Sequence, residues 1–367
     1  MKKIRIYRIC TFIILFCFVL DFNTVYASSK DIKVLNARSA IAIDSNTGRI
    51  LYEKNSEELI PMASTTKVMT ALVALKYGKL DEKITISKRS ANVSGSTVGY
   101  KKDEVITLKE LLYGLLLRSG NDAAIAIAEG ISGTVEDYLK LMNEYALQMG
   151  ISGTHFETPH GLDSEFHYTT SYELALIARK AMKEKTFREI VQTKTLDGKA
   201  YGFTRSYNNI NKILHLIPNA NGIKTGYTGN AGKCLVSSIK INNSEIIIVV
   251  LNSATRWKET QKIYDYVKEN YEFQKLADKN VILSSINIEG EKNPLKLALK
   301  EDIIVPIKKG TNFKLEIINP KEVKVPIKLD IPYGRVNIFE DDKIIYSKEL
   351  YTANEIKGKL VKKWFKF

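Results

Sequence analysis

Apolar positions in this chain follow two different periods, and each period predicts one kind of element. Between residues 64 and 184 apolar residues recur every three or four positions, which is the spacing of one helix face. Two further stretches lie on either side of this region, and in each of them a pair of apolar runs is split by turn residues, which predicts a β-hairpin. The expected helices are 64–77, 107–117, 121–131, 135–149 and 171–184, and the expected hairpins join 38–44 to 48–54 and 233–241 to 245–253.

These elements predict a mixed α/β (α+β) domain. Strands from both ends of the region form one antiparallel sheet, the helices pack against it, and a last helix runs over about 255–271. After about residue 277 the pattern changes, because Phe313, Leu315 and Ile317 alternate with charged residues, as do the apolar residues from 323 to 331. Period two predicts a small antiparallel β domain, and Pro326 assigns the 323–331 strand to a sheet edge. The expected domain limits are 28–276 and 277–354.

The first 27 residues have the features of a secretory signal peptide. Four basic residues precede an apolar run over 9–20, and small residues, Val25 and Ala27, occupy the positions that a signal peptidase recognises. The run is shorter than the roughly 20 residues that a membrane-spanning helix needs. Cleavage and export are therefore expected, with a retained anchor as the alternative. The expected location is the outer face of the cytoplasmic membrane or the cell wall.

Residues 355–367 form a basic amphipathic tail. On a helix Leu360, Val361, Trp364 and Phe365 share one face, and lysines lie towards the other. Such a segment can lie in the interface of an anionic membrane, which makes it a candidate anchor. The alternative is a basic tail or a helix docked on the β domain.

Composition narrows the partners and the compartment. The formal net charge is +14, which attracts anionic surfaces, and export excludes nucleic acid as a partner. Of the three cysteines, Cys10 and Cys17 leave with the leader, so Cys234 stands alone and no internal disulfide is expected. The four histidines have no zinc-ligand spacing, and neither a metal nor a cofactor is expected.

The first string with chemistry is Ser64-Thr65-Thr66-Lys67. On a helix that is apolar on every side, Ser64 and Lys67 project from one face within hydrogen-bonding reach. Burial lowers the pKa of a lysine, so a neutral amine could take the serine proton and make Ser64 a nucleophile. The same spacing arises by chance in Ser237-Ser238-Ile239-Lys240, but in a strand residues three apart point to opposite faces.

Two more strings complete the set. Ser119-Gly120-Asn121 joins two apolar helices, where Ser119 could relay a proton to a leaving amine and Asn121 could bond both Lys67 and a substrate amide; a helix cap is the alternative. Lys224-Thr225-Gly226 follows a turn, and on a strand edge it could hold a substrate carboxylate while Gly226 admits the substrate backbone. The N–H groups of Tyr227 and Ser64 could form an oxyanion hole. A surface turn is the alternative for this string.

With these strings in this order, the chain resembles the D-alanyl-D-alanine carboxypeptidases, the low-molecular-mass penicillin-binding proteins. The likeness covers nearly the whole chain and rests on residues 61–67, 118–123, 158–162 and 222–228. It implies the β-lactamase/DD-peptidase-like fold, serine acylation, removal of the terminal D-alanine from peptidoglycan pentapeptide stems, and covalent inhibition by penicillin and other β-lactams. Tyr227 stands where some relatives carry His, which bears on substrate preference.

Other activities on the same fold stay open at this point. A β-lactamase needs a glutamate-held water for fast deacylation, and Glu157, Glu165 and Glu173 lack the matching local motif. A DD-endopeptidase that cuts crosslinks and a slow β-lactam-binding wall protein are the remaining alternatives.

Overall fold

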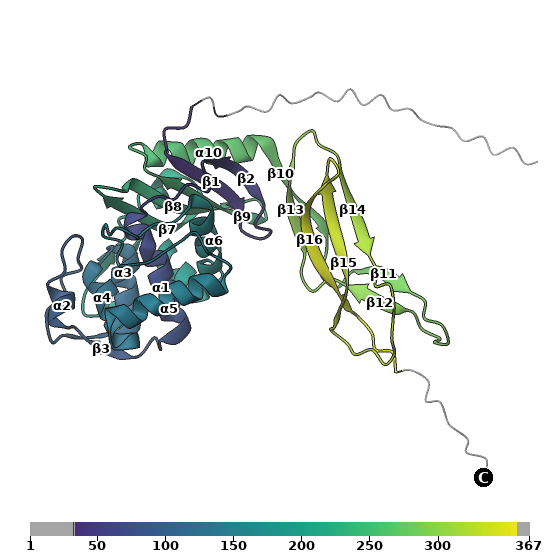
Figure 1. The fold of residues 1–367 in the computed structure, drawn as a ribbon, viewed down its shortest axis with the longest axis horizontal. Helices are drawn as coiled ribbons and strands as arrows, with labels where there is room; N and C mark the ends of the chain where they lie inside the picture. The colour runs from purple at the N-terminus through teal and green to yellow at the C-terminus, as the bar shows by residue number, and fades with distance from the viewer. Residues whose placement is uncertain (1–31, 33, 358–367) are drawn as a thin grey trace, which may run out of the picture.

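The computed structural model describes residue 32 and residues 34–357. The expected signal peptide and most of the expected tail lie outside the described residues. The part of the chain that carries the three sequence strings is called the catalytic part below. It contains a five-stranded antiparallel sheet in the order β2-β1-β9-β8-β7 (Figure 1). Its strands are β1 (Ser39–Asp44), β2 (Ile50–Lys54), β7 (Ala220–Thr228), β8 (Gly232–Ile241) and β9 (Ser244–Leu251).

The sheet joins the two ends of the catalytic part, as the hairpin pattern predicts. β1 pairs with β2 and β8 pairs with β9, so both expected hairpins are confirmed. The two hairpins meet where β1 lies antiparallel to β9, with Ala42 opposite Ile248. All eight residues of β9 are buried, because helices cover both faces of the sheet at this strand.

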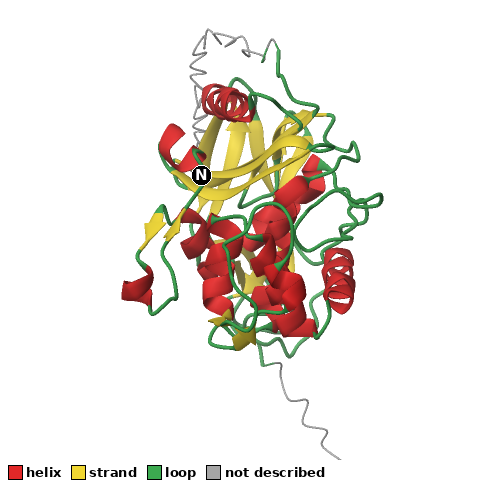
Figure 2. Ribbon diagram, turned by 90° about the vertical axis from the view of Figure 1, so that its left-hand side faces the viewer, coloured by secondary structure: helices red, strands yellow, loops and turns green. Residues whose placement is uncertain are grey.

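Helices on one face of the sheet surround α1 (Lys67–Tyr77), which a 3-10 turn, η1 (Ala63–Thr66), precedes. Figure 2 shows this helical cluster on one side of the sheet and α10 (Arg256–Asn270) on the other. Threonine side chains cap three of the helices, each by accepting a backbone N–H of the first turn. The capped helices are α3 (Leu108–Leu117), α5 (Val135–Gln148) and α6 (Ser171–Ala181), and α4 (Asn121–Ser132) lies between α3 and α5 in the chain.

Alternate residues of β1 divide between two cores. Ile41 and Ile43 pack with the α1 cluster, whereas Ala40 and Ala42 pack with α10.

The helices expected from the sequence are confirmed, and the first of them begins as a 3-10 turn. Short elements that the periodicity does not reveal are α2 (Lys88–Ala91), α7 (Lys185–Gln192), α8 (Gly198–Tyr201), α9 (Ile213–Leu216), β3 (Lys83–Thr85), β4 (Val105–Thr107), β5 (Thr195–Leu196) and β6 (Tyr207–Asn208).

The C-terminal part is a β structure, as predicted. A second five-stranded sheet has the order β11-β12-β16-β15-β14, and β10 pairs with β13 beside it. Leu295, Leu297, Val305, Val336 and Ile338 lie in its core. The strands are β10 (Tyr271–Ala277), β11 (Ile282–Ile286), β12 (Leu295–Ala298), β13 (Ile303–Lys308), β14 (Phe313–Ile318), β15 (Pro332–Glu340) and β16 (Lys343–Thr352).

One expected strand is wrong. Residues 323–331 form no strand, and of this stretch only Ile327 pairs, in a single bridge with Ile356. Pro326 has no N–H to donate to a ladder, and Leu329 and Ile331 are exposed rather than turned to a core. The edge strands of this sheet are β11 and β14 instead.

An ion pair joins the two parts. Arg49, just before β2, contacts both carboxylate oxygens of Glu340 on β15 and also donates to the carbonyl of Pro306. Both charged side chains are about nine-tenths buried. Because each charge is desolvated and paired, this contact resists rotation of one part against the other.

The position of α1 at the centre of the helical cluster predicts a large stability effect at Leu72. Its side chain is 1 % exposed, so Leu72→Ala leaves a cavity and should lower the free energy of unfolding by about 2–5 kcal/mol. Leu59→Ala is the matched control, because Leu59 is 52 % exposed and should change it by less than about 0.5 kcal/mol. Urea denaturation followed by near-ultraviolet circular dichroism measures both, and equal effects would contradict the assignment of the core.

Candidate active site

The three sequence strings converge on one cluster of side chains. Ser64 lies in η1, Lys67 begins α1, Ser119 and Asn121 flank the start of α4, and Lys224 lies on β7. η1 packs against β7, which brings the serine turn beside the lysine strand. The expected pairing of Ser64 with Lys67 is present, whereas the matching pair Ser237 and Lys240 lies on β8, where Ser237 is buried and Lys240 is exposed.

Lys67 holds the centre of the cluster. Its Nζ lies 2.9 Å from Ser64 Oγ, 2.7 Å from Asn121 Oδ1 and 2.6 Å from the carbonyl oxygen of His160. Burial, and then the charge of Lys224, hold the pKa of Lys67 well below its usual value, and Asp122 only partly offsets them. In its neutral form the amine has two N–H bonds and one lone pair. The two N–H bonds can be donated to Asn121 Oδ1 and to the carbonyl oxygen of His160. That lone pair faces the Ser64 hydroxyl.

Asn121 owes its orientation to a second contact. Its Nδ2 donates to the carbonyl of Ser94 at 2.7 Å, so its Oδ1 must face Lys67. The loop that carries Ser94 is held in turn by Asp122, whose carboxylate accepts the backbone N–H groups of Val98, Gly99 and Tyr100. The loop, α4 and α1 therefore form one hydrogen-bonded unit around the amine.

Lys224 is the second buried cation of the site, and its side chain is 1 % exposed. Its Nζ donates to Ser119 Oγ at 2.9 Å and to the carbonyl of Thr225 at 2.8 Å. Burial, followed by the charge of Arg256, lowers the pKa of Lys224 to about 7. The group can therefore be charged when an anion arrives and lose its proton in a slightly alkaline solution.

Strained backbone surrounds the reactive groups. Ala63 (φ 51°) and Ser119 (φ 62°) both have left-handed conformations that non-glycine residues rarely adopt. Such strain persists only where the surrounding packing enforces it, and it concentrates at functional sites. Here it directs Ser64 and Ser119 towards the two lysines.

Gly226 has a role beyond the expected one. A Cβ there would lie 3.0 Å from the backbone nitrogen of Ser64 and 3.2 Å from the carbonyl oxygen of Met62. The missing side chain thus lets η1 approach β7, in addition to any access that it gives to a substrate backbone. Next to it, the Tyr227 side chain is 67 % exposed and Thr225 is buried.

Three groups that support the site escape a search for side-chain motifs. His160 contributes its backbone carbonyl to Lys67, so its ring chemistry gives no clue to that contact. His167 accepts the Glu157 N–H at Nδ1 and therefore donates from Nε2 to Thr66 Oγ1; burial lowers its pKa to about 4. Arg256 donates to the carbonyls of Gly226 and Cys234, which fixes the end of β7 beside the site.

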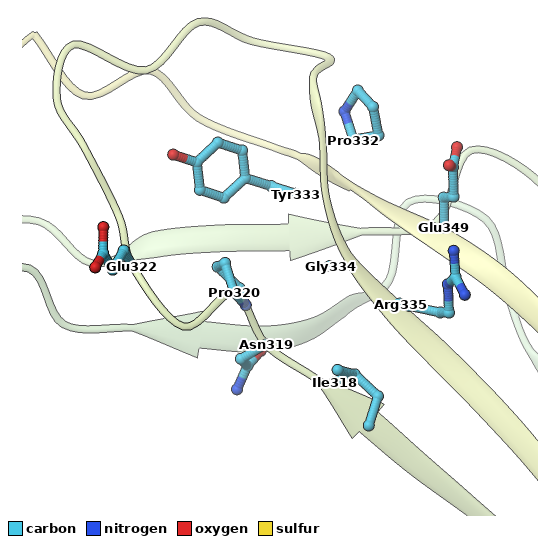
Figure 3. Close-up of a pocket in the computed structure, with 9 residues that line it drawn as sticks. All are labelled: Ile318, Asn319, Pro320, Glu322, Pro332, Tyr333, Gly334, Arg335 and Glu349. Carbon is cyan, nitrogen blue, oxygen red and sulfur yellow. The ribbon is translucent and has the colours of Figure 1, made fainter.

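A separate cavity of about 480 Å³ lies in the C-terminal part, at the ends of β14 and β15 (Figure 3). Tyr333, Arg335 and Glu349 are among the side chains that line it. It contains none of the residues of the three strings. Because no nucleophile with an adjacent base lines it, the cluster around Lys67 is the candidate active site.

Comparison with known proteins identifies the family. A family model described as D-alanyl-D-alanine carboxypeptidase matches residues 24–255, and one described as the penicillin-binding protein 5 C-terminal domain matches residues 271–358. The chain is 32 % identical to D-alanyl-D-alanine carboxypeptidase DacF of Bacillus subtilis, over 88 % of this chain and 86 % of that protein. It is 28 % identical to DacA of Escherichia coli K12, over 88 % of this chain and 84 % of the relative.

Solved structures agree with this relationship. Penicillin-binding protein 5 from Haemophilus influenzae superposes with a TM-score of 0.77 at 28 % identity, covering 89 % of this chain and 98 % of that one. A peptidoglycan synthesis regulatory factor (PBP3) from Streptococcus pneumoniae gives 0.77 at 25 % identity, over 88 % of this chain and all of that one. The fold is thus that of the penicillin-binding DD-peptidases. The chain belongs to the D-alanyl-D-alanine carboxypeptidase family and is a peptidase hydrolase of that family, with peptidoglycan and β-lactams as its ligand classes.

Gly161 offers a test of the packing that positions the serine. Gly161 has φ +87°, and a Cβ there would lie 1.9 Å from the backbone oxygen of Ala63, next to Ser64. Because this backbone cannot yield without moving the serine, Gly161→Ala should slow acylation by a β-lactam at least tenfold. Gly133→Ala is the control, since Gly133 (φ +78°) also has a positive φ but has open space around its Cβ. Equal acylation rates in the two variants, followed with a fluorescent penicillin, would contradict this account.

Proposed function

We propose that the protein removes the terminal D-alanine from peptidoglycan pentapeptide stems through an acyl-enzyme on Ser64. The observation that carries this proposal is the amine of Lys67, which is buried, has a lowered pKa and lies 2.9 Å from Ser64 Oγ. A nucleophilic serine needs a base in hydrogen-bonding contact, and Lys67 meets both the distance and the protonation state.

The first step forms the ester. Ser64 Oγ attacks the carbonyl carbon of the penultimate D-alanine, and its proton passes to Lys67 Nζ. The N–H groups of Ser64 and Tyr227 stabilise the oxyanion of the tetrahedral intermediate. When the intermediate collapses, the peptide C–N bond breaks, and the proton that Lys67 took from Ser64 passes through Ser119 Oγ to the leaving amine, which returns Lys67 to its neutral form. Ser119 Oγ is held in place by Lys224 Nζ at 2.9 Å. Free D-alanine departs.

Lys224 and Thr225 select the substrate. They hold the carboxylate of the departing D-alanine by charge and by the threonine hydroxyl, which anchors the scissile bond over Ser64. In the second step water attacks the ester carbonyl and transfers a proton to Lys67. The shortened stem leaves, and the serine regains its hydrogen. A β-lactam follows the same first step, with its amide opened and the leaving nitrogen still tethered.

The surrounding carboxylates favour a carboxypeptidase over a β-lactamase. Glu173 accepts the N–H groups of Ser152 and Gly153, and Glu157 accepts from Ser164 and Phe166. Within residues 34–357, neither carboxylate forms a hydrogen bond with Ser64 or Lys67. The fast deacylation of a β-lactamase needs such a group to hold its water.

The proposal extends to the remaining organisation of the chain. Residues 1–27 direct export and are removed, residues 28–276 form the catalytic domain, and residues 277–354 form the C-terminal β domain. The tail at 355–367 meets the anionic surface of the membrane, with the enzyme on its outer face. Within the described residues no helix has the length and apolar character to cross a bilayer.

The serine and its base are tested by D-alanine release. With a diacyl-L-Lys-D-Ala-D-Ala peptide, Ser64→Ala should abolish release, and Lys67→Ala should lower kcat by about 10²–10⁴-fold because the general base is lost. Lys240→Ala is the control, because Lys240 has the same spacing from a serine but lies exposed on β8. Release from Ser64→Ala at the native rate would refute the mechanism, and labelling by penicillin without release from the native protein would favour a β-lactam-binding wall protein.

The pH dependence should separate the two lysines. Because the pKa of Lys224 in the empty site is about 7, the ammonium that binds the carboxylate is lost as the pH rises through that value. KM should therefore rise above about pH 7, by up to roughly tenfold per pH unit. Bound carboxylate raises the pKa of Lys224, so kcat should stay constant as the pH rises through about 7, because the lowered pKa of Lys67 favours the neutral amine that acts as the base. Initial rates between about pH 5 and 9 measure both constants. A KM that is flat across this range would contradict the assignment of Lys224.

A further inference from the structure

A basic groove of about 570 Å³ lies on the catalytic part, far from the reactive serine. The C-terminal ends of α1, α5 and α6 meet there, and α1 separates the groove from Lys67. At a rise of 1.5 Å per residue, the 11 residues of α1 make it about 16 Å long. The cations that line this basic groove are Lys76, Arg179, Lys180 and Lys183.

None of these four cations forms an ion pair with any described residue. No acidic side chain lines the groove. The carboxylate of Glu301 lies near Lys183 but is bonded to Lys348 at 2.7 Å. Burial, and then the charges of Arg179 and Lys180, lower the pKa of Lys183, and the charge of Glu301 offsets them only in part.

Helix capping does not account for these cations. Basic residues are common at helix C-termini, where they offset the dipole and bond the last carbonyls. Here Arg179 donates instead to the carbonyls of Ser45 and Asn46 in the β1–β2 turn, and Lys76 contacts the side chain of Gln148. The side-chain Nζ of Lys180 and that of Lys183 form no hydrogen bond with a described residue. Their ammonium groups are therefore available to a ligand.

Lysine ammonium groups supply the free positive charge of the groove. A guanidinium fork can bind carboxylate or phosphate through two parallel bonds, but the Nε and Nη2 of Arg179 are already bonded to carbonyls. Three lysine ammonium groups remain, and such point charges suit tetrahedral phosphate groups approached from several directions. Between them lie apolar surfaces from Tyr145, Met149 and Leu176, which can contact the carbon chain between successive phosphates.

We infer that the basic groove binds an anionic polymer with repeated phosphodiester groups, of the polyol-phosphate class found in cell walls. The cations are spread over the ends of α1 and α6, so a single phosphate group would contact only one or two of them. A lipid surface fits less well, because Tyr145 on the floor of the groove is only 7 % exposed, whereas a flat bilayer reaches protruding side chains. Bound in this way, the polymer would hold the enzyme against its wall substrate and leave the serine cleft open.

Binding of end-labelled poly(glycerol phosphate) to the exported chain tests the inference. We expect Lys180→Gln combined with Lys183→Gln to weaken binding roughly tenfold, since two exposed charge contacts are lost. Binding should also weaken between about 50 and 200 mM salt. The control is Lys258→Gln combined with Lys268→Gln, which removes the same charge from exposed, unpaired lysines of α10 on the opposite face of the sheet.

Several results would overturn the inference. Equal weakening in the two double variants would assign the binding to net charge alone. Stronger binding to phosphatidylglycerol vesicles than to the polymer would make the groove a lipid site. Competition by inorganic phosphate at the same phosphate concentration would show that the repeated groups are not used. Loss of binding after penicillin acylation would place the polymer in the serine cleft, whereas binding unchanged by acylation supports the separate groove. Circular dichroism checks that each variant is folded.

Discussion

Two lysine amines are buried in one site, and the cost of burying their charge organises the structure around them. Moving an ammonium group out of water costs several kcal/mol even after the protein relaxes. Lys67 and Lys224 are both about 1 % exposed or less, and the charge of one opposes that of the other. Burial lowers the pKa of both amines, and the charge of Lys224 lowers that of Lys67 further. Contact with Ser64 Oγ then makes Lys67 the base, whereas Lys224, which contacts Ser119, is left to bind the anion.

The scaffold is arranged to maintain that assignment. The carbonyls of Asn121 and His160 take the two hydrogens of the neutral Lys67 amine and leave its lone pair for the serine. Asp122 is the nearest anion to affect Lys67, yet its carboxylate is occupied by backbone N–H groups of the loop over the site. Were it free to pair with Lys67, it would raise the pKa of that amine and remove the base. A buried carboxylate is therefore used to hold a loop, at a distance that leaves the amine uncharged.

Periodicity in the sequence was enough to predict the sheet, the main helices and the pairing of Ser64 with Lys67, because each of these depends on the local spacing of residues. The contacts that set the protonation of Lys67 could not be predicted in the same way. The His160 carbonyl belongs to the backbone, so no side-chain motif marks it. Residues 158–162, which contain His160, are nevertheless among those that carry the family resemblance. Within this stretch residue 161 must be a glycine, because its φ of +87° and its close approach to the backbone of Ala63 exclude a side chain. The failure at 323–331 is of another kind: the residues alternate as in a strand, but only Ile327 has a bridge partner, and Leu329 and Ile331 are exposed.

The same residue type serves opposite purposes at the two ends of α1. At its start, Lys67 is excluded from water and becomes a base; at its end, Lys76 stays exposed beside Tyr145. Salt distinguishes the two environments, because the Debye length is about 8 Å at physiological ionic strength and screens exposed charges far more than buried ones. The balance between Lys67 and Lys224 is thus insulated from the ionic strength of the medium, whereas the charges of the basic groove respond to it. One helix therefore separates chemistry that must be constant from an attraction that varies with the surroundings.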